Sequence, residues 1–493
     1  MTDKDKDKDI FKNKKISDNT YKGDIIKLIG LSGQFQCNRS EYFFPNTTMF
    51  RRYVRELVYS GYIAEDSPFS NGDIENLKDY KNLFLEPLGK KVLEELYPDI
   101  YEYYKFTTQG RIRKAMSSAE DKQAYMIKSL KRSIKLAILN ISDLKEQQEL
   151  LDEFESIKDN STKRELLNFK NKNKSIKKNF NLKMVENPNT ALLRTLKTGS
   201  VISFIYNNNV CVLPSQKQEL DLNDDKKYNL PEKKLFFFQA RELKNIFGEN
   251  VDFAKAKGII FKEDKTFVLY NINSINSMWE YAHEQKFISN LKVFENKKFN
   301  NRSNVDIQAI LFYRDDTLAV NYLSDRDNIT NLSALDNSFS SILYIPLFTN
   351  IMKKIDGDTD EVFYDFSNEK FQVAVSDYNS IFINKLLENI SNTEEVGESS
   401  YMPFDFFSKK YNEETCEYDM TYHFSFLNSD ILRLKKILYF AEALSDKVII
   451  YAFNTHKNIF SHLPFLSKNI EIKYLDIRNV KLREETIFPK LGL

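Results

Sequence analysis

A helical stripe of apolar residues that ends at a glycine constrains this chain more than any other feature. Residues 49–60 read MFRRYVRELVYS, and their apolar positions recur every three or four residues, as on one face of a helix. Those positions are Phe50, Tyr53, Val54, Leu57 and Val58. Arg51, Arg52 and Arg55 fall outside the stripe, and Gly61 follows as a residue suited to a helix end. The pattern predicts a helix with a buried face and an exposed face that carries arginine.

The segments around this helix predict a winged helix-turn-helix over roughly residues 24–96. In chain order we expect a helix at Asp24–Gly33, a turn at 45–48, the arginine helix, strands at 62–63 and 83–85 around a polar loop at 65–79, and a helix at 90–97. In such a module the second helix enters the major groove of DNA and the polar loop is the wing.

The exposed arginines predict a double-stranded DNA partner. Arginine can contact phosphate or bind the edge of guanine with two hydrogen bonds, and polar residues at a helix start can contact phosphate. The residues expected at this interface are Asn46, Thr47, Thr48, Arg51, Arg52, Arg55, Lys78, Lys81, Arg111, Arg113 and Lys114. The alternative is a protein-binding module whose arginine face is only solvated.

Composition limits where such an interface can lie. Lys and Arg (72) almost cancel Asp and Glu (71), so a nucleic-acid surface must be local. The three cysteines, Cys37, Cys211 and Cys416, lie far apart, which argues against a disulfide framework and favours a reducing compartment. Zinc-ligand spacing, a signal peptide and a long apolar run are all missing from the sequence. We therefore expect a cytoplasmic protein with no membrane contact, no metal and no cofactor.

Changes in composition divide the chain into four parts. We expect a disordered charged tail over 1–20, a winged-helix domain with a helical extension over 21–155, a basic linker over 156–188 and an α/β domain over 189–493. The last part could form two subdomains, near 189–350 and 351–493. The lysine-rich linker has the alternative role of touching phosphate. We find no internal repeat in the sequence.

The second half predicts a mixed α/β domain. Strand-like runs occur at 201–206, 235–239, 258–261, 267–271, 306–313, 341–348, 371–376, 447–453 and 470–477. Helical patterns occur between them at 240–247, 278–293, 380–390 and 429–443. Strands that alternate with helices favour a mixed or parallel sheet covered by helices, so the fold class is α+β or α/β.

Several tracts resemble the replication-relaxation family of plasmid and integrative-element proteins from bacteria such as the Firmicutes. Thr47–Glu65 and Phe84–Leu96 carry the resemblance first, and the basic segment Gly110–Ser117 extends it more weakly. In the second half, the tracts similar to such mobile-element proteins are Phe236–Gly248, Ala256–Phe287 and Ser341–Phe348. The resemblance implies a winged helix joined to an α/β domain, acting on DNA in replication initiation or conjugative transfer.

Some proteins of this type carry a core like that of restriction endonucleases. That core holds a divalent metal with a Glu on its first helix, an Asp at a strand start and an Asp/Glu-x-Lys motif on the next strand. Glu284 and Asp306 stand in suitable places, but the next predicted strand, 318–323, offers Asn321 and Leu323 instead. We therefore expect a degenerate, restriction-endonuclease-like core that pairs with a second copy or with replication or transfer proteins.

Two other functions stay open from the sequence. One is a metal-dependent nickase or relaxase that uses Glu284 and Asp306 as catalytic residues. The other is a transcriptional regulator whose second domain senses a ligand or forms a dimer.

Overall fold

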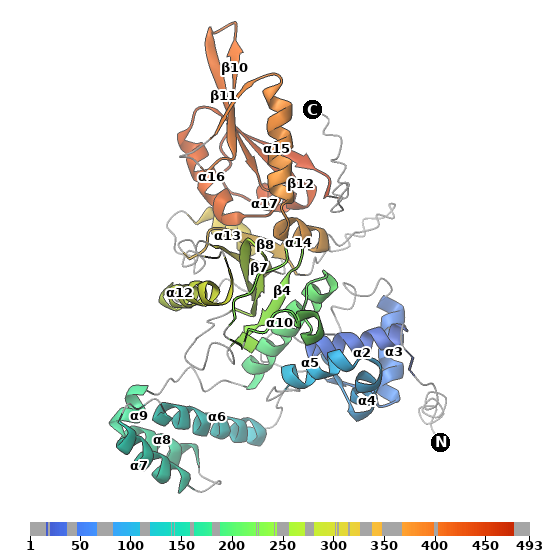
Figure 1. Ribbon diagram of the computed structural model, residues 1–493, viewed down its shortest axis with the longest axis vertical. Helices are drawn as coiled ribbons and strands as arrows, with labels where there is room; N and C mark the ends of the chain where they lie inside the picture. Colours follow the sequence, from blue (N-terminus) through green and yellow to red (C-terminus); the bar gives the residue numbers. More distant parts are fainter. Residues whose placement is uncertain are drawn as a thin grey trace. The chain divides into compact units, whose positions relative to one another are not determined.

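The computed structural model shows a mixed α+β protein whose chain separates into two compact units, residues 1–203 and 204–493. The structure describes residues 16–17, 20–36, 47–66, 82–108, 119–139, 141, 143–157, 162–179, 188–222, 224, 226–240, 242–243, 256–271, 281–300, 302, 305–313, 316–325, 338–347, 367–398 and 403–477. Within these ranges lie 15 helices, two five-stranded mixed sheets and one small sheet (Figure 1). No helix in the described ranges is long and apolar enough to cross a membrane.

The first unit begins with helices around the small sheet. The elements are α2 (Tyr21–Ser32), β1 (Phe35–Gln36), α3 (Thr47–Tyr59), β2 (Ile63–Asp66), β3 (Asn82–Leu85), α4 (Pro87–Leu96) and α5 (Pro98–Thr108). The strands are antiparallel in the order β1-β3-β2. Helix α2 starts earlier than the predicted Asp24, because the Thr20 hydroxyl accepts a hydrogen bond from the Gly23 N–H and caps the helix. It ends, as predicted, at Gly33, which has a φ of 72°.

Four further helices in the first unit share a core of their own. They are α6 (Ala119–Leu139), α7 (Leu144–Glu155), α8 (Lys163–Lys172) and α9 (Lys174–Asn179). Leu166, Phe169 and Ile176 from α8 and α9 are buried together with apolar residues of α6 and α7. The structure therefore differs from the linker predicted over 156–188. Few residues in this stretch are apolar, yet those few meet the apolar faces of α6 and α7, and burial against them stabilises short helices.

The second unit contains the two larger sheets. The first sheet, in the order β4-β5-β6-β7-β8, consists of β4 (Phe236–Gln239), β5 (Gly258–Phe261), β6 (Lys265–Asn271), β7 (Asp306–Tyr313) and β8 (Ile342–Pro346). The second sheet, in the order β13-β12-β11-β10-β9, consists of β9 (Glu395–Glu398), β10 (Phe406–Asn412), β11 (Glu417–Ser425), β12 (Lys447–Phe453) and β13 (Ile470–Leu475). The other elements are α10 (Pro188–Asn207), which continues from the first unit, η3 (Pro214–Lys217), α12 (Tyr281–Lys298), α13 (Thr317–Ser324), α14 (Ser367–Val375), α15 (Tyr378–Ser391), α16 (Ile431–Ala443), η5 (Asn454–His456) and α17 (Lys457–Ser461).

Helices cover both faces of the second sheet. Along β12, Val448, Ile450 and Ala452 belong to the core that includes α16. The alternate residues Ile449, Tyr451 and Phe453 belong to a separate core formed with α15. Because side chains alternate across a strand, a strand covered on both sides reads as one continuous apolar run. This is why β12 and β7 are found at the residues where the sequence predicts them.

The two sheets have the same topology. Each begins with three antiparallel strands in sequence order and continues with two parallel strands. A helix connects the third strand to the fourth in both sheets, α12 in one and α16 in the other, and a shorter helix connects the fourth to the fifth. The sequence shows no repeat, but the described part of the fold contains this arrangement twice.

Three predicted strands are helices in the structure. Residues 201–206 lie in α10, residues 318–323 lie in α13 and residues 371–376 correspond to α14 and the bend after it. A short apolar run fits a buried strand and a buried helix equally well, so periodicity alone cannot separate them. Conversely, the strands β9, β10 and β11 were not predicted, because the distal part of the hairpin formed by β10 and β11 is polar and exposed. The predicted helix 240–247, the polar loop 65–79 and the charged tail lie largely outside the described residues.

Candidate nucleic-acid interface

Helix α3 separates its side chains sharply into a buried and an exposed face. Phe50, Val54 and Leu57 are buried. Successive residues turn by about 100° around a helix axis, so a second set of residues gathers on the opposite side. That set is exposed to solvent and consists of Thr48, Arg51, Arg52, Arg55 and Tyr59. The arginines therefore lie together on one outward surface, as the sequence predicted.

Contacts behind α3 fix this surface in place. Phe50 meets Phe35 edge to face with 6.4 Å between ring centroids, and Tyr53 packs on Tyr21 of α2 at 5.3 Å. Helix α3 ends where Gly61 adopts a φ of 73° and the Tyr62 N–H donates to the Leu57 carbonyl. Strand β2 begins directly after this turn and pairs with β3.

Helix α4 comes close to the backbone at the end of α3. A Cβ atom at Gly89 would lie 2.0 Å from the Tyr62 carbonyl oxygen, so only glycine permits this approach. The backbone that follows the arginine helix is thus held on a rigid support.

The three arginines differ in their ion pairs. Arg52 Nε lies 3.0 Å from Glu56 Oε1, and Lys22 Nζ of α2 lies 2.6 Å from Glu56 Oε2. Burial pushes the pKa of Glu56 upward, but hydrogen bonds and charges from Lys22 and Arg52 outweigh it and leave the pKa lowered. Within the described residues, Arg51 and Arg55 have no such carboxylate partner. They are the two cations of α3 available to an external anion.

The remaining predicted interface residues cannot be placed on this surface. Asn46, Lys78, Lys81, Arg111, Arg113 and Lys114 lie outside the described residues. Thr47 is the first residue of α3, and only its backbone is described. Thr48 is exposed next to the arginines.

Two residues of this surface were not predicted from the sequence. Tyr59 is exposed four residues after Arg55, so helical spacing could have identified it. Lys22 reaches Glu56 from α2, and also lies 5.6 Å from the centre of the Tyr53 ring. No local signal in the sequence predicts a contact between two helices so far apart in the chain.

The two candidate catalytic acids lie at opposite ends of the first sheet. The Tyr270 hydroxyl donates a hydrogen bond of 2.7 Å to Glu284 Oε2, and both side chains are buried. Strands β6 and β7 are parallel, with Lys265 opposite Asp306 and Tyr270 opposite Leu311. Tyr270 is therefore five residues further along the sheet than Asp306, which corresponds to about 16 Å. Because the Tyr270 hydroxyl holds Glu284 at that end of the strands, this offset separates the two acids by more than one metal ion can bridge.

Each of these acids also has partners of its own. Glu284 holds the Tyr270 hydroxyl, and Asp306 accepts hydrogen bonds from the Gln308 amide and the Ser340 hydroxyl. Asn321, expected on a strand beside them, lies in helix α13. Across the described residues, no group of three His, Cys, Asp or Glu side chains could hold a metal ion.

A buried serine and histidine meet in the second unit. Ser429, which has a φ of 61°, lies with its hydroxyl 2.9 Å from His456 Nε2. His456 Nδ1 accepts a hydrogen bond from the Phe453 N–H, so the ring proton is on Nε2 and points at the serine. A general base would need Nε2 free of its proton. Both residues are also fully enclosed, so this pair fixes a turn in the fold.

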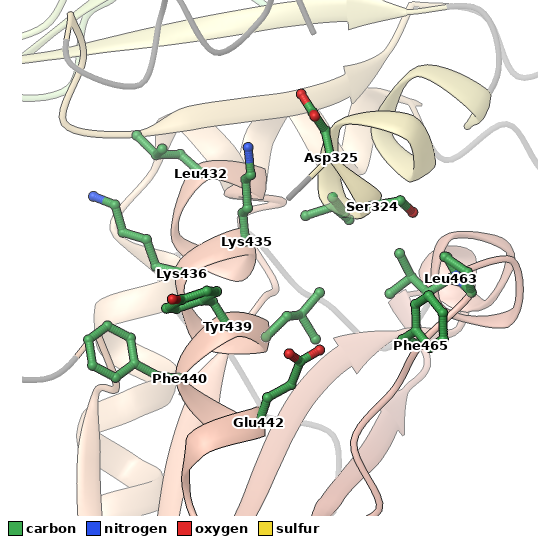
Figure 2. Close-up of a pocket in the computed structure, with 13 residues that line it drawn as sticks. Ser324, Asp325, Leu432, Lys435, Lys436, Tyr439, Phe440, Glu442, Leu463 and Phe465 are labelled. Atoms are coloured by element: carbon green, nitrogen blue, oxygen red, sulfur yellow. The ribbon is translucent and has the colours of Figure 1, made fainter. Parts of the chain in front are cut away.

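A groove in the second unit exposes several aromatic rings. It has a volume of about 390 Å³ and lies between α16 on one side and α13 with residues 463–465 on the other. Figure 2 shows Tyr439 and Lys436 on the α16 wall and Phe465 on the opposite wall. Tyr439 is 73% exposed and Phe465 is 69% exposed. The groove combines apolar rings with amines and carboxylates.

Comparisons with known proteins give no relative for this chain. No family model, no curated protein and no solved structure matches it.

Proposed function

We propose that the segment from α2 to α4 is a winged helix-turn-helix and that it binds double-stranded DNA through the exposed face of α3. The observation that carries this proposal is the gathering of Arg51, Arg52 and Arg55 on one solvent-facing surface, directly opposite a buried stripe. The ladder of β2 and β3 comes straight after this helix, where the strands of a wing belong. Arg51 and Arg55 supply charged donors, and Thr48 and Tyr59 supply hydroxyls beside them.

The resemblance of the sequence to the replication-relaxation family supports a role on a plasmid or integrative element. Under this proposal the first unit binds DNA in replication initiation or conjugative transfer. The second unit is a degenerate, restriction-endonuclease-like domain that contacts a second copy or a protein of the same process. The separation of Glu284 from Asp306 argues against the metal-dependent nickase.

The test replaces the two available arginines of α3 and keeps the helix intact. The variant Arg51→Gln, Arg55→Gln removes two charges with a residue that favours helices. Its matched control is Lys91→Gln, Lys105→Gln, which removes two exposed charges from α4 and α5 of the same unit. Binding to duplex DNA is titrated by fluorescence anisotropy at two salt concentrations.

We expect the arginine variant to bind at least about tenfold more weakly than the control and to show a smaller dependence on salt. Each lost phosphate contact should lower the slope of log K against log salt by about 0.9. Equal binding by the arginine variant, the control and the parent would reject α3 as the DNA-binding helix.

A further inference from the structure

The four-helix bundle formed by α6 to α9 separates its charges between helices. Helix α7 reads LKEQQELLDEFE, and its acids Glu149, Asp152 and Glu153 are exposed. Helices α8 and α9 read KRELLNFKNK and KSIKKN, with a single acid between them. The bundle therefore has an acidic helix and a basic pair of helices that share one core.

Several basic residues of α8 are exposed, whereas Lys170 is buried. Leu166 and Phe169 point into the bundle, while Arg164 and Lys172 are exposed. Asn168 and Asn171 are exposed as well, and the turn of about 100° per residue places Asn168 between the two cations and Asn171 on the side of Arg164. Guanidinium, amine and amide groups are the side chains that most often donate to phosphate oxygens.

The exposed cations of α8 and α9 whose side chains the structure describes make no ion pair with a described acid. The one acid, Glu165, is committed to the helix start, where its carboxylate accepts the Thr162 N–H at 2.7 Å and completes a capping box. Five exposed cations have no ion pair among the described residues. They are Lys163, Arg164, Lys172, Lys174 and Lys177.

Three acids of α7 have partners other than these cations. Lys135 of α6 pairs with Glu155 of α7 at 3.1 Å, and Gln148 holds Asp152 at 2.8 Å. Glu146 accepts a hydrogen bond of 2.6 Å from the Ser175 hydroxyl of α9. This bond ties α9 to α7 and orders the helix that carries Lys174 and Lys177.

We infer that the exposed side of α8 and α9 is a second DNA-binding surface, one that contacts the phosphate backbone without reading sequence. The inference rests on the proposed function, because it takes DNA as the partner of the chain. A ten-residue helix is about 15 Å long, and a duplex presents about nine phosphates over that length of its axis. This phosphate spacing is dense enough for the exposed cations along α8 to find phosphates within reach.

The experiment compares four variants of the full chain on duplex DNA. The bundle variant is Lys163→Gln, Arg164→Gln, Lys172→Gln, Lys174→Gln, Lys177→Gln. A charge-matched control replaces five exposed lysines of the second unit, Lys226, Lys227, Lys292, Lys297 and Lys468, by glutamine. The third variant is Arg51→Gln, Arg55→Gln in α3. The fourth variant replaces the bundle lysines by arginine and tests whether positive charge alone is sufficient for binding. Circular dichroism verifies the helix content of each variant.

We expect the bundle variant to lose affinity equally on unrelated DNA sequences, with the salt slope reduced by about 0.9 for each lost contact. The lysine-to-arginine variant should bind like the parent. If the bundle variant matches the control while the α3 variant loses binding, this inference is wrong and the proposed function stands. If only the bundle variant loses binding, this inference stands and α3 is rejected as the DNA-binding helix. Absence of DNA binding by the parent rejects both.

Discussion

His423 is an imidazole enclosed within one face of the second sheet, between a serine and a tyrosine. Its Nε2 lies 2.9 Å from the Ser408 hydroxyl of β10, and its Nδ1 lies 3.1 Å from the Tyr451 hydroxyl of β12. All three side chains are buried. Burial lowers the pKa of His423 to about 4, and the positive charges of Lys473 and Lys447 act in the same direction. The ring is therefore neutral in the folded protein at neutral pH.

This histidine should make the fold sensitive to acid. The unfolded chain takes up the proton near pH 6.5, whereas the folded chain resists it until about pH 4, so stability is lost as the pH falls through that window. The shift corresponds to about 3 kcal/mol at 1.36 kcal/mol per pKa unit. We expect urea unfolding of His423→Gln to show a shallower loss of stability between pH 7 and pH 4 than the parent.

Glutamine can still bond to both hydroxyls, so the comparison isolates the titration of the ring. Burial also lowers the pKa of His456, which remains in both proteins and contributes equally to each. Parallel pH profiles for the parent and His423→Gln would show that His423 does not titrate in this range.

At the scale of elements, α8 shows how little apolar surface is needed to order a polar segment. Leu166 and Phe169 belong to the core of the α6 to α9 bundle, and Phe169 lies 5.6 Å from Phe154 of α7. The surrounding residues are mostly Lys and Asn, which explains why this segment was predicted to be a linker. Its stability as a helix depends on those few contacts.

Removal of the Phe169 ring should open this part of the bundle. Replacement of a buried phenylalanine by alanine costs about 3–5 kcal/mol. That loss should raise the open population, and with it the rate of trypsin cleavage at the lysines of α8 and α9, by about 100-fold or more. The measurement is limited proteolysis of Phe169→Ala beside the exposed control Asn171→Ala. Similar cleavage of the two variants would mean that α8 is not held by this core.

At the scale of the whole molecule, the topology of the first sheet keeps the two candidate catalytic acids apart. The hydrogen bond to Tyr270 holds Glu284 near the carboxyl ends of β6 and β7, while Asp306 opens β7 at the other end. We expect no cleavage of supercoiled plasmid by the purified chain in Mg²⁺ or Mn²⁺. The parent is assayed beside Glu284→Gln, Asp306→Asn. Cleavage by the parent that this variant loses would restore the nickase as the better hypothesis.

The sequence alone predicted much of the surface of α3 and several buried strands. Arg51, Arg52 and Arg55 could be placed on an exposed face because helical spacing depends only on neighbours along the chain. The sequence could not show that Arg52 forms an ion pair with Glu56, because the position of the Glu56 carboxylate also depends on Lys22 from another helix. Likewise β7 and β12 were predicted at the residues where they occur, but the equally apolar run at 201–206 is helical.

What the sequence determined by itself was therefore local: the helix with its arginine face, the glycine that ends it, and strands covered on both sides. What only the tertiary structure decided were contacts between distant segments. Helices α8 and α9 are ordered by α6 and α7, the two candidate acids are held apart by the parallel register of β6 and β7, and the two sheets share one path. The physical reason is that burial depends on which distant surfaces meet, and spacing along the chain does not specify that meeting.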